Sequence, residues 1–587
     1  MNKGVWIWYP ADYEVRLARD LGCKRCLRDT IVPPEWRVDD RYGIVAFCRE
    51  FELPEDETVT VKCLGKMNIS VDWNNSLTGF KGVLPLKKGK HYIEIRVYNP
   101  NGVPSLCISG RGLKTDKDWT AMYGWEQQRA KVPVGYGEKP VGIKFVKTEI
   151  NAERVAGYKG VYDFGRETMG RVTFLAAGKG EVGIFYGESL EECLDTANCE
   201  LTDTVRVNKA KKYTAPVKAF RFVNLQCTGG VKTENVAGVS EMLPVKNKAD
   251  FTCGDGLLNR IYKVSERTLH LCMREFFLDG IKRDRWVWGG DAYQSFLMNY
   301  YSFGDMEIVK RTLLALAGKP PYDRHINRIP SYTFFWLMGF AEYYERTGDA
   351  EFCGKFFSTA AALMDFCISR ANKRGLIDDS YGDWMYVDWA EGLDDGGEVA
   401  YNNILFCAAL KKFSWLCGVF DKPKQEKYAA LSESVLKTVM QVFWDEKRGC
   451  FLYNAKDKDK PEPSIKRQPN IMAVLFNAVP AEKQKTIIQN VLLNDKIDKI
   501  TTPYMRFFEL DALAQAGRAD YVREEIKAYW GGMLDLGATS FWETFDPRQT
   551  GAGHYAMYGR KYGKSLCHAW GASPIYLLAR YKEEMKL

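Results

Sequence analysis

Hydrophobic and polar positions along the chain follow two different periods, and the change falls near residue 245. Before it, apolar residues alternate with polar ones, as in residues 92–97 (YIEIRV), and a turn cluster, NPNG, follows at 99–102. This pattern is typical of half-buried antiparallel strands. It predicts two β-sandwiches in tandem, over residues 1–120 and 121–247. Further strand-like segments lie at 59–64, 143–146, 172–175, 182–186 and 220–225.

After this point the apolar residues recur at the spacing of helices, so residues 248–587 are predicted to form one helical domain. Boundaries predicted in this way can be wrong by two to four residues. The twelve candidate helices cover residues 255–275, 290–303, 305–317, 331–346, 348–373, 397–418, 423–443, 467–478, 480–493, 503–516, 518–533 and 565–584.

The joints between these helices alternate in length. Short joints such as FGD at 303–305 and TGD at 347–349 place a glycine where a helix ends and an aspartate where the next begins. Other joints are long and rich in Gly, Asp, Trp and Pro, as at 374–396, 444–466 and 534–564. Six hairpins with short loops at one end and long loops at the other predict an (α/α)6 barrel, whose long loops line one mouth.

Composition narrows the class of protein. The chain has 587 residues, 46% of them hydrophobic and 27% charged, which are ordinary globular values. Its 83 basic and 75 acidic residues are interspersed, and the net charge of +8 is mild for this length, so a nucleic-acid partner is not expected. The oligomeric state stays open.

Targeting signals are not visible either. The first residues, MNKGVWIWYPADYEV, lack the apolar core of a signal peptide, and no run approaches the ~18 apolar residues of a membrane span. We therefore expect a cytoplasmic protein without a membrane partner, or a periplasmic one if a signal segment has been removed. The 16 cysteines are scattered, and the CxxC at Cys23 and Cys26 has no second pair or nearby histidine, so no metal site is expected.

Three of the long joints combine acidic residues with tryptophans: LDGIKRDRWVWGGDAY at 278–293, YGDWMYVDWAEGLDDGGE at 381–398 and GATSFWETFDP at 537–547. Such a combination suits a sugar, whose apolar face stacks on a ring while carboxylates and arginines bind its hydroxyls. Carboxylates close together in a cleft also acquire different pKa values, as glycoside hydrolysis requires of its acid and base. Taken alone, each segment also fits a surface ion-pair network with tryptophans that pack between helices. Three of them in loops at one end of a barrel favour a site.

Several motifs resemble one known family. The sequence from Asp279 to Asp291 (DGIKRDRWVWGGD) is similar to the signature of glycoside hydrolase family 78, the α-L-rhamnosidases, which commonly reads Asp-Cys-Pro-Gln-Arg-Glu-Arg-Leu-Gly-Trp-Thr-Gly-Asp. GATSFWE resembles the family's Gly-Ala-Thr-Thr-x-Trp-Glu, and SLCHAWGASP at 565–574 its Ser-Leu-x-His segment. YDFGRETMGRV at 162–172 is similar to the family's Asp-Phe-Gly segment before the barrel. The motifs follow the family's order from about residue 140 to the end.

The resemblance implies roles for named residues. Glu543 would be the general base that activates water for single-step inversion, and Asp284 falls at the position of the general acid. An inverting pair lies about 6.5–9.5 Å apart, which leaves room for the water. The reaction would need no cofactor and no metal. The residues expected to bind or shape the pocket around the rhamnose are Asp279, Arg283, Trp288, Asp291, Trp336, Trp384 and His568, with Trp336 and Trp384 placed by neighbourhood rather than by a motif.

Two positions depart from the family's pattern. The family's acid is usually Glu, whereas residue 284 is Asp, one methylene shorter, and a displacement of about 1 Å can cost roughly 100-fold in rate. Either the backbone advances, the substrate sits differently, or the activity is reduced. Lys282 replaces the family's Gln; it either adds a cation near the mouth that would suit a uronic acid next to the rhamnose, or is simply solvated.

The sequence therefore predicts N-terminal antiparallel β-sandwiches followed by an (α/α)6 barrel, and an enzyme that removes terminal α-L-rhamnose with inversion from oligosaccharides, polysaccharide side chains or glycosides. Its partner would be a rhamnose-containing carbohydrate. Two alternatives stay open: a hydrolase or lyase for another terminal sugar on the same barrel, and a rhamnose- or uronate-binding relative that has lost the acid.

Overall fold

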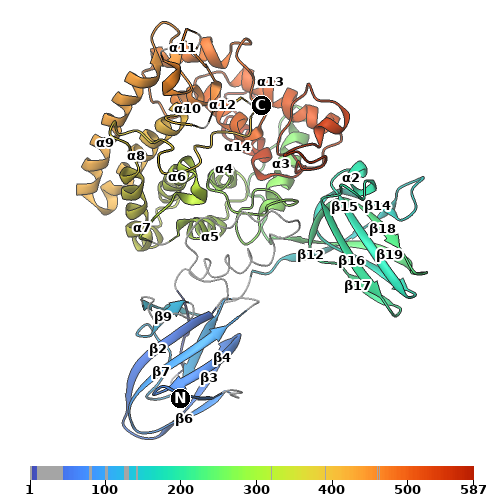
Figure 1. Ribbon diagram of the computed structural model, residues 1–587, viewed down its shortest axis with the longest axis vertical. Coiled ribbons are helices and arrows are strands. Elements are labelled where there is room, and N and C mark those ends of the chain that lie inside the picture. Colours follow the sequence, from blue (N-terminus) through green and yellow to red (C-terminus); the bar gives the residue numbers. More distant parts are fainter. Residues whose placement is uncertain are drawn as a thin grey trace. The chain divides into compact units, whose positions relative to one another are not determined.

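The computed structural model describes residues 3–9, 44–77, 82–99, 103–123, 131–139, 143–318, 320–390, 392–394, 396–458, 460–461 and 463–587 (Figure 1). The chain divides into two compact units, Met1–Lys144 and Phe145–Leu587. Cys23 and Cys26, the only CxxC of the sequence, lie outside the described residues.

The first unit is a β-sandwich. One sheet has the strand order β11-β1-β8-β3-β6, and the other has the order β10-β9-β2-β7-β4-β5. Alternation explains the core: in β7, Ile93, Ile95 and Val97 are fully buried, and the residues between them are not. Its strands are β1 (Trp6–Trp8), β2 (Ile44–Leu53), β3 (Glu57–Leu64), β4 (Lys66–Val71), β5 (Asn74–Leu77), β6 (Val83–Leu86), β7 (Gly89–Tyr98), β8 (Ser105–Ser109), β9 (Thr120–Tyr123), β10 (Val132–Pro133) and β11 (Gly135–Gly137).

The first sandwich extends beyond its predicted boundary at residue 120. Strand β9 pairs with β2, β10 pairs with β9, and β11 pairs with β1, so the residues up to about 137 belong to the first unit. The sequence from 112 to 140 lacks a clear period, which hid these three short strands.

The second β-domain is a single hydrogen-bonded sheet of eight strands. Its 17-residue strand β14 pairs with β18 near its start and with β19 and β17 further on, with an irregularity between Asp163 and Thr168. The other strands are β12 (Val146–Asn151), β13 (Glu153–Arg154), β15 (Gly180–Gly187), β16 (Leu201–Val207), β17 (Lys211–Thr214), β18 (Lys218–Cys227) and β19 (Lys232–Met242); β14 spans Val161–Ala177, and the short helix α2 (Leu190–Leu194) follows β15.

The helical domain contains the predicted helices in the predicted order, most within a few residues. They are α3 (Gly256–Cys272), α4 (Gly289–Tyr300), α5 (Met306–Ala317), α6 (Pro330–Thr347), α7 (Ala350–Ser369), α8 (Ala400–Phe420), α9 (Lys422–Phe443), α10 (Arg467–Leu475), α11 (Ala481–Ile487), α12 (Pro503–Gln515), α13 (Ala519–Asp535) and α14 (Pro574–Arg580). The last helix is much shorter than the predicted 565–584, because residues 565–568 belong to a loop and a short 3₁₀ turn, Ala569–Ala572, follows it.

Alternate helices form a closed inner ring. Helix α4 contacts α6, α6 contacts α8, α8 contacts α10, α10 contacts α12, α12 contacts α14, and α14 contacts α4 (Figure 1). These helices are buried on most sides, as in α12, where residues 503–514 are all buried. An outer helix such as α9 buries only a stripe, Tyr428, Ser432, Val435, Val439 and Phe443, at helical spacing. The (α/α)6 barrel is therefore confirmed.

The short joints end and begin helices as their residues predict. Gly348 has a φ of 64° and the left-handed conformation after α6, and Asp349 caps α7 by accepting a hydrogen bond from the Phe352 amide. Asp305 caps α5 in the same way after Gly304. Because these turns are so short, the long joints all lie at the other end of the hairpins, and three of them carry the acidic, tryptophan-bearing segments.

Two helices, α7 and α8, are long and apolar enough to cross a membrane by length and composition. Neither is an uninterrupted apolar run, since α7 contains Glu351, Lys355 and Asp365 and α8 contains Lys411 and Lys412. Both helices pack in the barrel: α7 contacts α6 and α8, and α8 belongs to the inner ring. Apolar helices are the normal content of such a core.

A glycine at the start of α4 sets how closely two inner helices approach. A Cβ added to Gly289 would lie 2.8 Å from both the Cβ and the carbonyl oxygen of Tyr332 in α6. Gly289→Ala is therefore expected to lower the free energy of unfolding by about 1–3 kcal/mol, through overpacking that only a helix shift relieves. Urea unfolding measures this. Gly256→Ala is the matched control, since a Cβ there meets nothing within 4 Å. Equal stability of the two variants would contradict the account.

Candidate active site

The segment that joins α3 to α4 closes on itself around Asp279. The amide of Asp279 donates to the carbonyl of Trp286 at 3.0 Å, and the amide of Trp286 donates back to Asp279 Oδ1 at 2.7 Å. Between them, Asp284 and Arg285 have φ angles of 51° and 54°, and the Arg285 amide donates to the carbonyl of Arg283 at 2.6 Å. Successive non-glycine residues at positive φ are uncommon, and such strain gathers at functional sites. The tight turn presents Asp284 at its tip.

Glu543 lies in the long joint between α13 and α14, almost fully buried. Its Oε1 accepts hydrogen bonds from Arg283 Nη2 at 2.7 Å and from the Tyr558 hydroxyl at 2.9 Å, and its Oε2 accepts one from the Ser565 amide at 2.9 Å. Burial alone would raise the pKa of Glu543, but Arg283 and the Ser565 amide outweigh it and hold the pKa below its ordinary value. Glu543 is thus kept ionised, as a general base must be.

Arg283 connects the two predicted catalytic carboxylates. Its Nη2 contacts Glu543, its Nη1 lies 3.5 Å from Asp284 Oδ1, and its Nε donates to the carbonyl of Gly563 at 3.1 Å. One planar guanidinium therefore sets the position of Glu543 relative to Asp284. The Asp284 side chain is 37% exposed, whereas that of Glu543 is 3% exposed, so the two carboxylates have different access to solvent.

Asp279, Asp291 and His568 form the buried side of the site. Burial raises the pKa values of Asp279 and Asp291 well above the ordinary value, with further contributions from neighbouring carboxylates. Burial also lowers the pKa of His568 to about 3, so the imidazole is neutral. His568 Nε2 lies 4.0 Å from Asp291 Oδ1, and its ring stacks on Trp570 with centroids 3.9 Å apart. Polar groups that are buried and close together offer both donors and acceptors for sugar hydroxyls.

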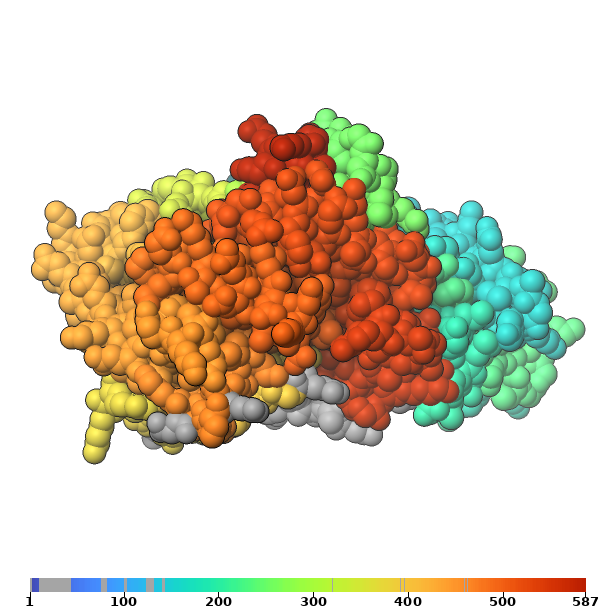
Figure 2. All heavy atoms as spheres, turned by 90° about the horizontal axis from the view of Figure 1, so that it is seen from above, coloured from blue at the N-terminus to red at the C-terminus, as the bar shows by residue number. Residues whose placement is uncertain are grey.

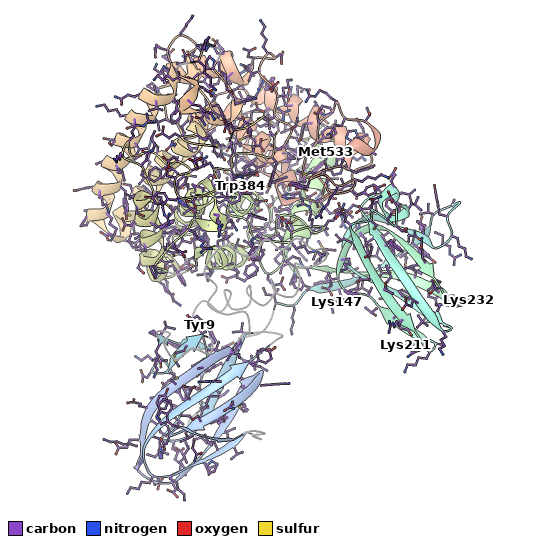
Figure 3. The ribbon with its side chains drawn as sticks, viewed as in Figure 1. Tyr9, Lys147, Lys211, Lys232, Trp384 and Met533 are labelled. Carbon is purple, nitrogen blue, oxygen red and sulfur yellow. The ribbon has the colours of Figure 1, made fainter. Side chains whose placement is uncertain are left out.

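Aromatic rings border this cluster. Trp288 lies edge-on to Tyr332 at 6.3 Å, and Tyr332 donates to Asp291 Oδ2 at 3.5 Å. Trp384, labelled in Figure 3, is 38% exposed and lies in T-shaped contact with Trp389 at 5.4 Å. The structure therefore brings the predicted Trp288 and Trp384 into one aromatic border with Tyr332 and Trp389.

Four neighbours of the cluster were not predicted individually. Tyr386 and Trp389 lie in the acidic, tryptophan-rich segment at 381–398, so the segment was identified but not these members. Tyr332 could be found only by knowing which face of α6 points inward. Tyr558, which lies 5.2 Å from Trp389 and contacts Glu543, has no sequence motif of its own.

Trp336 lies at a different place. Its indole Nε1 donates to the carbonyl of Leu313 in α5 at 2.9 Å, and its ring stacks on Phe340 at 5.4 Å. It therefore packs between α5 and α6, and this geometry gives no support to a role in the sugar pocket. Position in the sequence near the site was not enough to place Trp336. The orientation of α6 about its own axis brings Tyr332, not Trp336, beside Asp291.

Lys282 is neither at the mouth nor solvated, so both interpretations of its charge are wrong. It is 2% exposed, and its Nζ donates to Glu192 Oε2 at 3.0 Å and lies 3.4 Å from Glu188 Oε2. Both glutamates belong to the second β-domain, at the end of β15 and in α2. Burial alone would lower the pKa of Lys282, but these carboxylates outweigh it and raise the pKa.

The same ammonium group binds the loop before α14. Lys282 Nζ donates to the carbonyls of Tyr562 at 2.7 Å and Lys564 at 3.0 Å, while Glu188 Oε2 accepts from the Leu566 amide at 2.5 Å. Figure 2 shows the red C-terminal segment directly against the cyan and teal β-domain. We call Lys282, Glu188 and Glu192 the buried clamp. It holds together the loop that carries Asp284, the loop that holds Glu543, and the β-domain.

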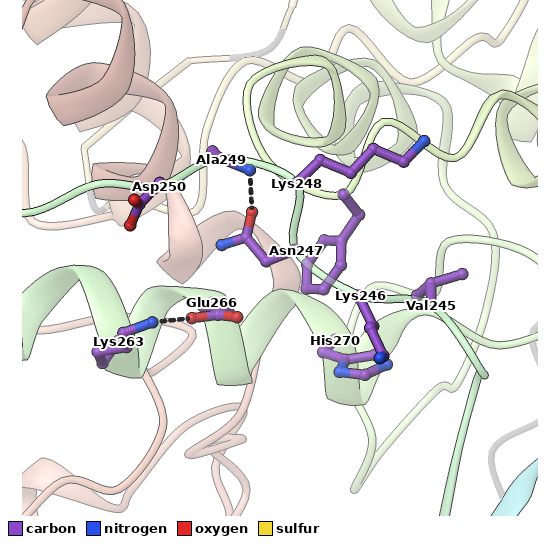
Figure 4. Close-up of a pocket in the computed structure, with 10 residues that line it drawn as sticks. Val245, Lys246, Asn247, Lys248, Ala249, Asp250, Lys263, Glu266 and His270 are labelled. Atoms are coloured by element: carbon purple, nitrogen blue, oxygen red, sulfur yellow. Dashed lines mark hydrogen bonds and ion pairs between the residues drawn. The ribbon is translucent and has the colours of Figure 1, made fainter.

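A separate cavity of about 570 Å³ lies beside the linker from β19 to α3 (Figure 4). Its lining is the linker 245–250 with Lys263, Glu266, His270 and Phe303, and it includes none of the predicted site residues. Within the described residues, no group of three or more His, Cys, Asp or Glu side chains could hold a metal ion.

A closed ring of helical hairpins, with paired carboxylates and aromatic rings in its long loops, is the architecture of a six-hairpin glycosidase. A family model described as the bacterial alpha-L-rhamnosidase 6-hairpin glycosidase domain matches residues 246–581, more than half of the chain. The protein therefore belongs to the bacterial α-L-rhamnosidases with this domain. A second model, described as alpha-rhamnosidase-like, bacteroidetes, N-terminal, matches residues 45–129 and 138–225.

Solved structures share the fold. A rhamnosidase from Klebsiella oxytoca with rhamnose bound has a TM-score of 0.65 and 22% identity, over 75% of this chain and 97% of that one. The GH78 rhamnosidase of Bacillus sp. GL1 has a TM-score of 0.63 and 21% identity, over 91% and 66%. The Streptomyces avermitilis α-L-rhamnosidase complexed with L-rhamnose has 0.60 and 15%, over 92% and 61%. No curated protein sequence matches the chain.

Removal of the one cation of the buried clamp should strongly lower the stability of the protein. Lys282→Met would leave Glu188 and Glu192 buried without a counter-charge, and is expected to lower the free energy of unfolding by about 3–5 kcal/mol. Lys561→Met is the matched control. Lys561 pairs with Asp195 of the same β-domain at 2.7 Å but is 50% exposed, so its loss should cost far less than that of Lys282. Chemical unfolding compares them, and similar losses would refute the clamp.

Proposed function

We propose that this glycosidase removes terminal α-L-rhamnose from an oligosaccharide, a polysaccharide side chain or a glycoside in one step, with inversion at the anomeric carbon. Glu543 is the general base that activates water, and Asp284 is the general acid that protonates the leaving oxygen. Asp279, Asp291, Arg283 and His568 bind the rhamnose hydroxyls in this proposal.

The contact of one guanidinium with both carboxylates carries the proposal. Because Arg283 binds Glu543 through Nη2 and lies 3.5 Å from Asp284 through Nη1, the carboxyl groups are separated by at most the width of that guanidinium plus its two contacts. A separation of this order is compatible with the roughly 6.5–9.5 Å that leaves room for a water in an inverting pair. The closed, buried side formed by Asp291 and His568 supports attack on a chain end rather than within a chain.

The two carboxylates also differ in their contacts and in their access to solvent. Glu543 is held ionised by donors on both of its oxygens, which suits a base. Asp284 stands at the tip of a strained turn with a partly exposed side chain, where a leaving group can reach it. Its left-handed backbone offers a way to advance a side chain that is one methylene shorter than glutamate.

The base is tested by Glu543→Gln. The amide keeps the size of the side chain, and its single oxygen can still accept from Arg283 and Tyr558 while the hydrogen bond from the Ser565 amide is lost, so the fold should be kept with only a small loss in the thermal midpoint. Turnover of an aryl α-L-rhamnoside should fall by about 100- to 10,000-fold, because general base catalysis is lost. Normal turnover would exclude Glu543 as the base, and a collapse of the thermal midpoint would assign it a structural role.

The acid is tested by the leaving group. An activated aryl group needs little protonation, so Asp284→Asn should cleave an aryl α-L-rhamnoside nearly as fast as wild type and lose about 100-fold or more on a rhamnosyl oligosaccharide. Asp284→Glu is the matched variant that keeps the acid. Equal losses on both substrates would contradict the role of Asp284. Binding of L-rhamnose without cleavage of either substrate by wild type would favour the binding-protein alternative.

A further inference from the structure

Tyr558 occupies the tip of a very tight hairpin in the loop before α14. Met557 and Arg560 exchange two backbone hydrogen bonds, of 3.0 and 2.9 Å, and form an isolated antiparallel bridge. The two residues between them, Tyr558 and Gly559, have φ angles of 54° and 68°. A two-residue hairpin loop with positive φ at both central positions is a type I′ turn.

A tyrosine is an unusual residue at this position. The first central residue of a type I′ turn is normally Asn, Asp or Gly, because a bulky side chain at positive φ crowds the backbone. Gly559 meets the requirement, whereas Tyr558 does not. Strain of this kind persists where surrounding contacts fix it, and it gathers at functional sites.

The contacts of the Tyr558 side chain all lead to the candidate site. Its hydroxyl donates to Glu543 Oε1 at 2.9 Å. The guanidinium of Arg283 lies over its ring, 4.3 Å from the centroid, and Trp389 meets the ring edge-on at 5.2 Å. The residue is nonetheless 40% exposed, so its side chain is not needed to fill a core.

The hairpin itself is fixed by the loop that follows it. A Cβ on Gly563 would lie 2.3 Å from the carbonyl oxygen of Met557, so the two backbones are in close contact. The carbonyl of Gly563 accepts from Arg283 Nε, and the amide of Lys564 donates to the carbonyl of Tyr555 at 3.1 Å. Tyr558 is therefore presented to Glu543 on a backbone with little freedom to move.

We propose that Tyr558 is a positioning residue for the general base: its strained turn is retained because the hydroxyl fixes the Glu543 carboxylate and favours its ionised form. Arg283 and Tyr558 then share Oε1, while Oε2 accepts from the Ser565 amide. The inference rests on the role proposed for Glu543 and adds a residue that neither the motifs nor the comparisons assign.

The direction of the pH effect follows from this contact. A hydrogen bond to the charged form of a carboxylate lowers its pKa, so loss of the phenol should raise the pKa of Glu543. The base acts only when ionised, so the acidic limb of kcat/KM should move to higher pH, by up to about one pH unit for one hydrogen bond to a charged group. The other groups that face Glu543 stay in place: Arg283, Asp291, Lys564 and His568.

Two substitutions distinguish a positioning role of Tyr558 from a purely structural role. Tyr558→Phe keeps the ring and removes the hydroxyl, so kcat/KM for an aryl α-L-rhamnoside should fall by about 10- to 100-fold, with the shifted acidic limb and a nearly unchanged thermal midpoint. Tyr558→Asn creates the Asn-Gly pair that a type I′ turn prefers, so its thermal midpoint should equal or exceed that of wild type although its activity falls at least as far. Tyr555→Phe is the control from the same loop and should leave the pH profile unchanged.

The inference would be overturned if the acidic limb of kcat/KM in Tyr558→Phe lay at the same pH as in wild type. A thermal midpoint of Tyr558→Asn well below that of wild type would overturn it too. The pKa of Glu543 can also be read without substrate, from the ¹³C carboxyl signal of labelled glutamate, assigned by its loss in Glu543→Gln. If wild type cleaves no rhamnoside, the proposed function fails on its own, while a higher Glu543 pKa in Tyr558→Phe than in wild type still supports the contact and an equal pKa overturns it.

Discussion

The arrangement of the site depends on one buried charge. Lys282 is removed from water, and its cost of desolvation is offset by Glu188 and Glu192 of the β-domain and by the carbonyls of the loop before α14. Because Arg283 and Asp284 follow it directly in the chain, fixing Lys282 also fixes the turn that presents them. Without the carboxylates of the β-domain, burial of this ammonium group would be strongly unfavourable.

The clamp also accounts for the second half of the site. Glu188 binds the amide of Leu566, and the neighbouring Ser565 amide donates to Glu543, so the β-domain is linked to the base through two hydrogen bonds and one peptide unit. Glu543 thereby gains its donors from backbone and side chains that are themselves held. Such preorganisation stabilises developing charge without rearrangement during the reaction. The β-domain thus gives structural support to the candidate site.

Much of this could be predicted from the sequence, because its signals are local. Glycine and aspartate at helix ends, such as Gly348 and Asp349, give the hairpins and hence the end of the barrel at which the long loops lie. The roles of Asp284 and Glu543 come from motifs and stay predictions. The environment of Lys282 was predicted wrongly because it depends on residues distant in sequence. Lys282 could not be placed because its partners lie about ninety positions earlier, as the separation from Glu192 shows.

Two other features were outside the reach of local patterns. The side of α6 that faces the site depends on how the helix is rotated against its neighbours, and it places Tyr332 beside Asp291 while Trp336 packs against α5. Tyr558 is contrary to the local preference of its turn, and its side chain contacts Glu543, Arg283 and Trp389, all distant in sequence. Departures from local preference mark the sites where function, rather than folding, selects the residue.

The central claim is that Asp284 and Glu543, both held by one guanidinium, act as an inverting pair. In such a pair a water molecule lies between the base and the sugar. The most direct measurement is ¹H NMR of the first sugar released from an aryl α-L-rhamnoside, before mutarotation mixes the anomers. The account predicts that β-L-rhamnose is released first. Initial release of α-L-rhamnose would mean retention through a covalent intermediate, and would contradict the roles given to both carboxylates.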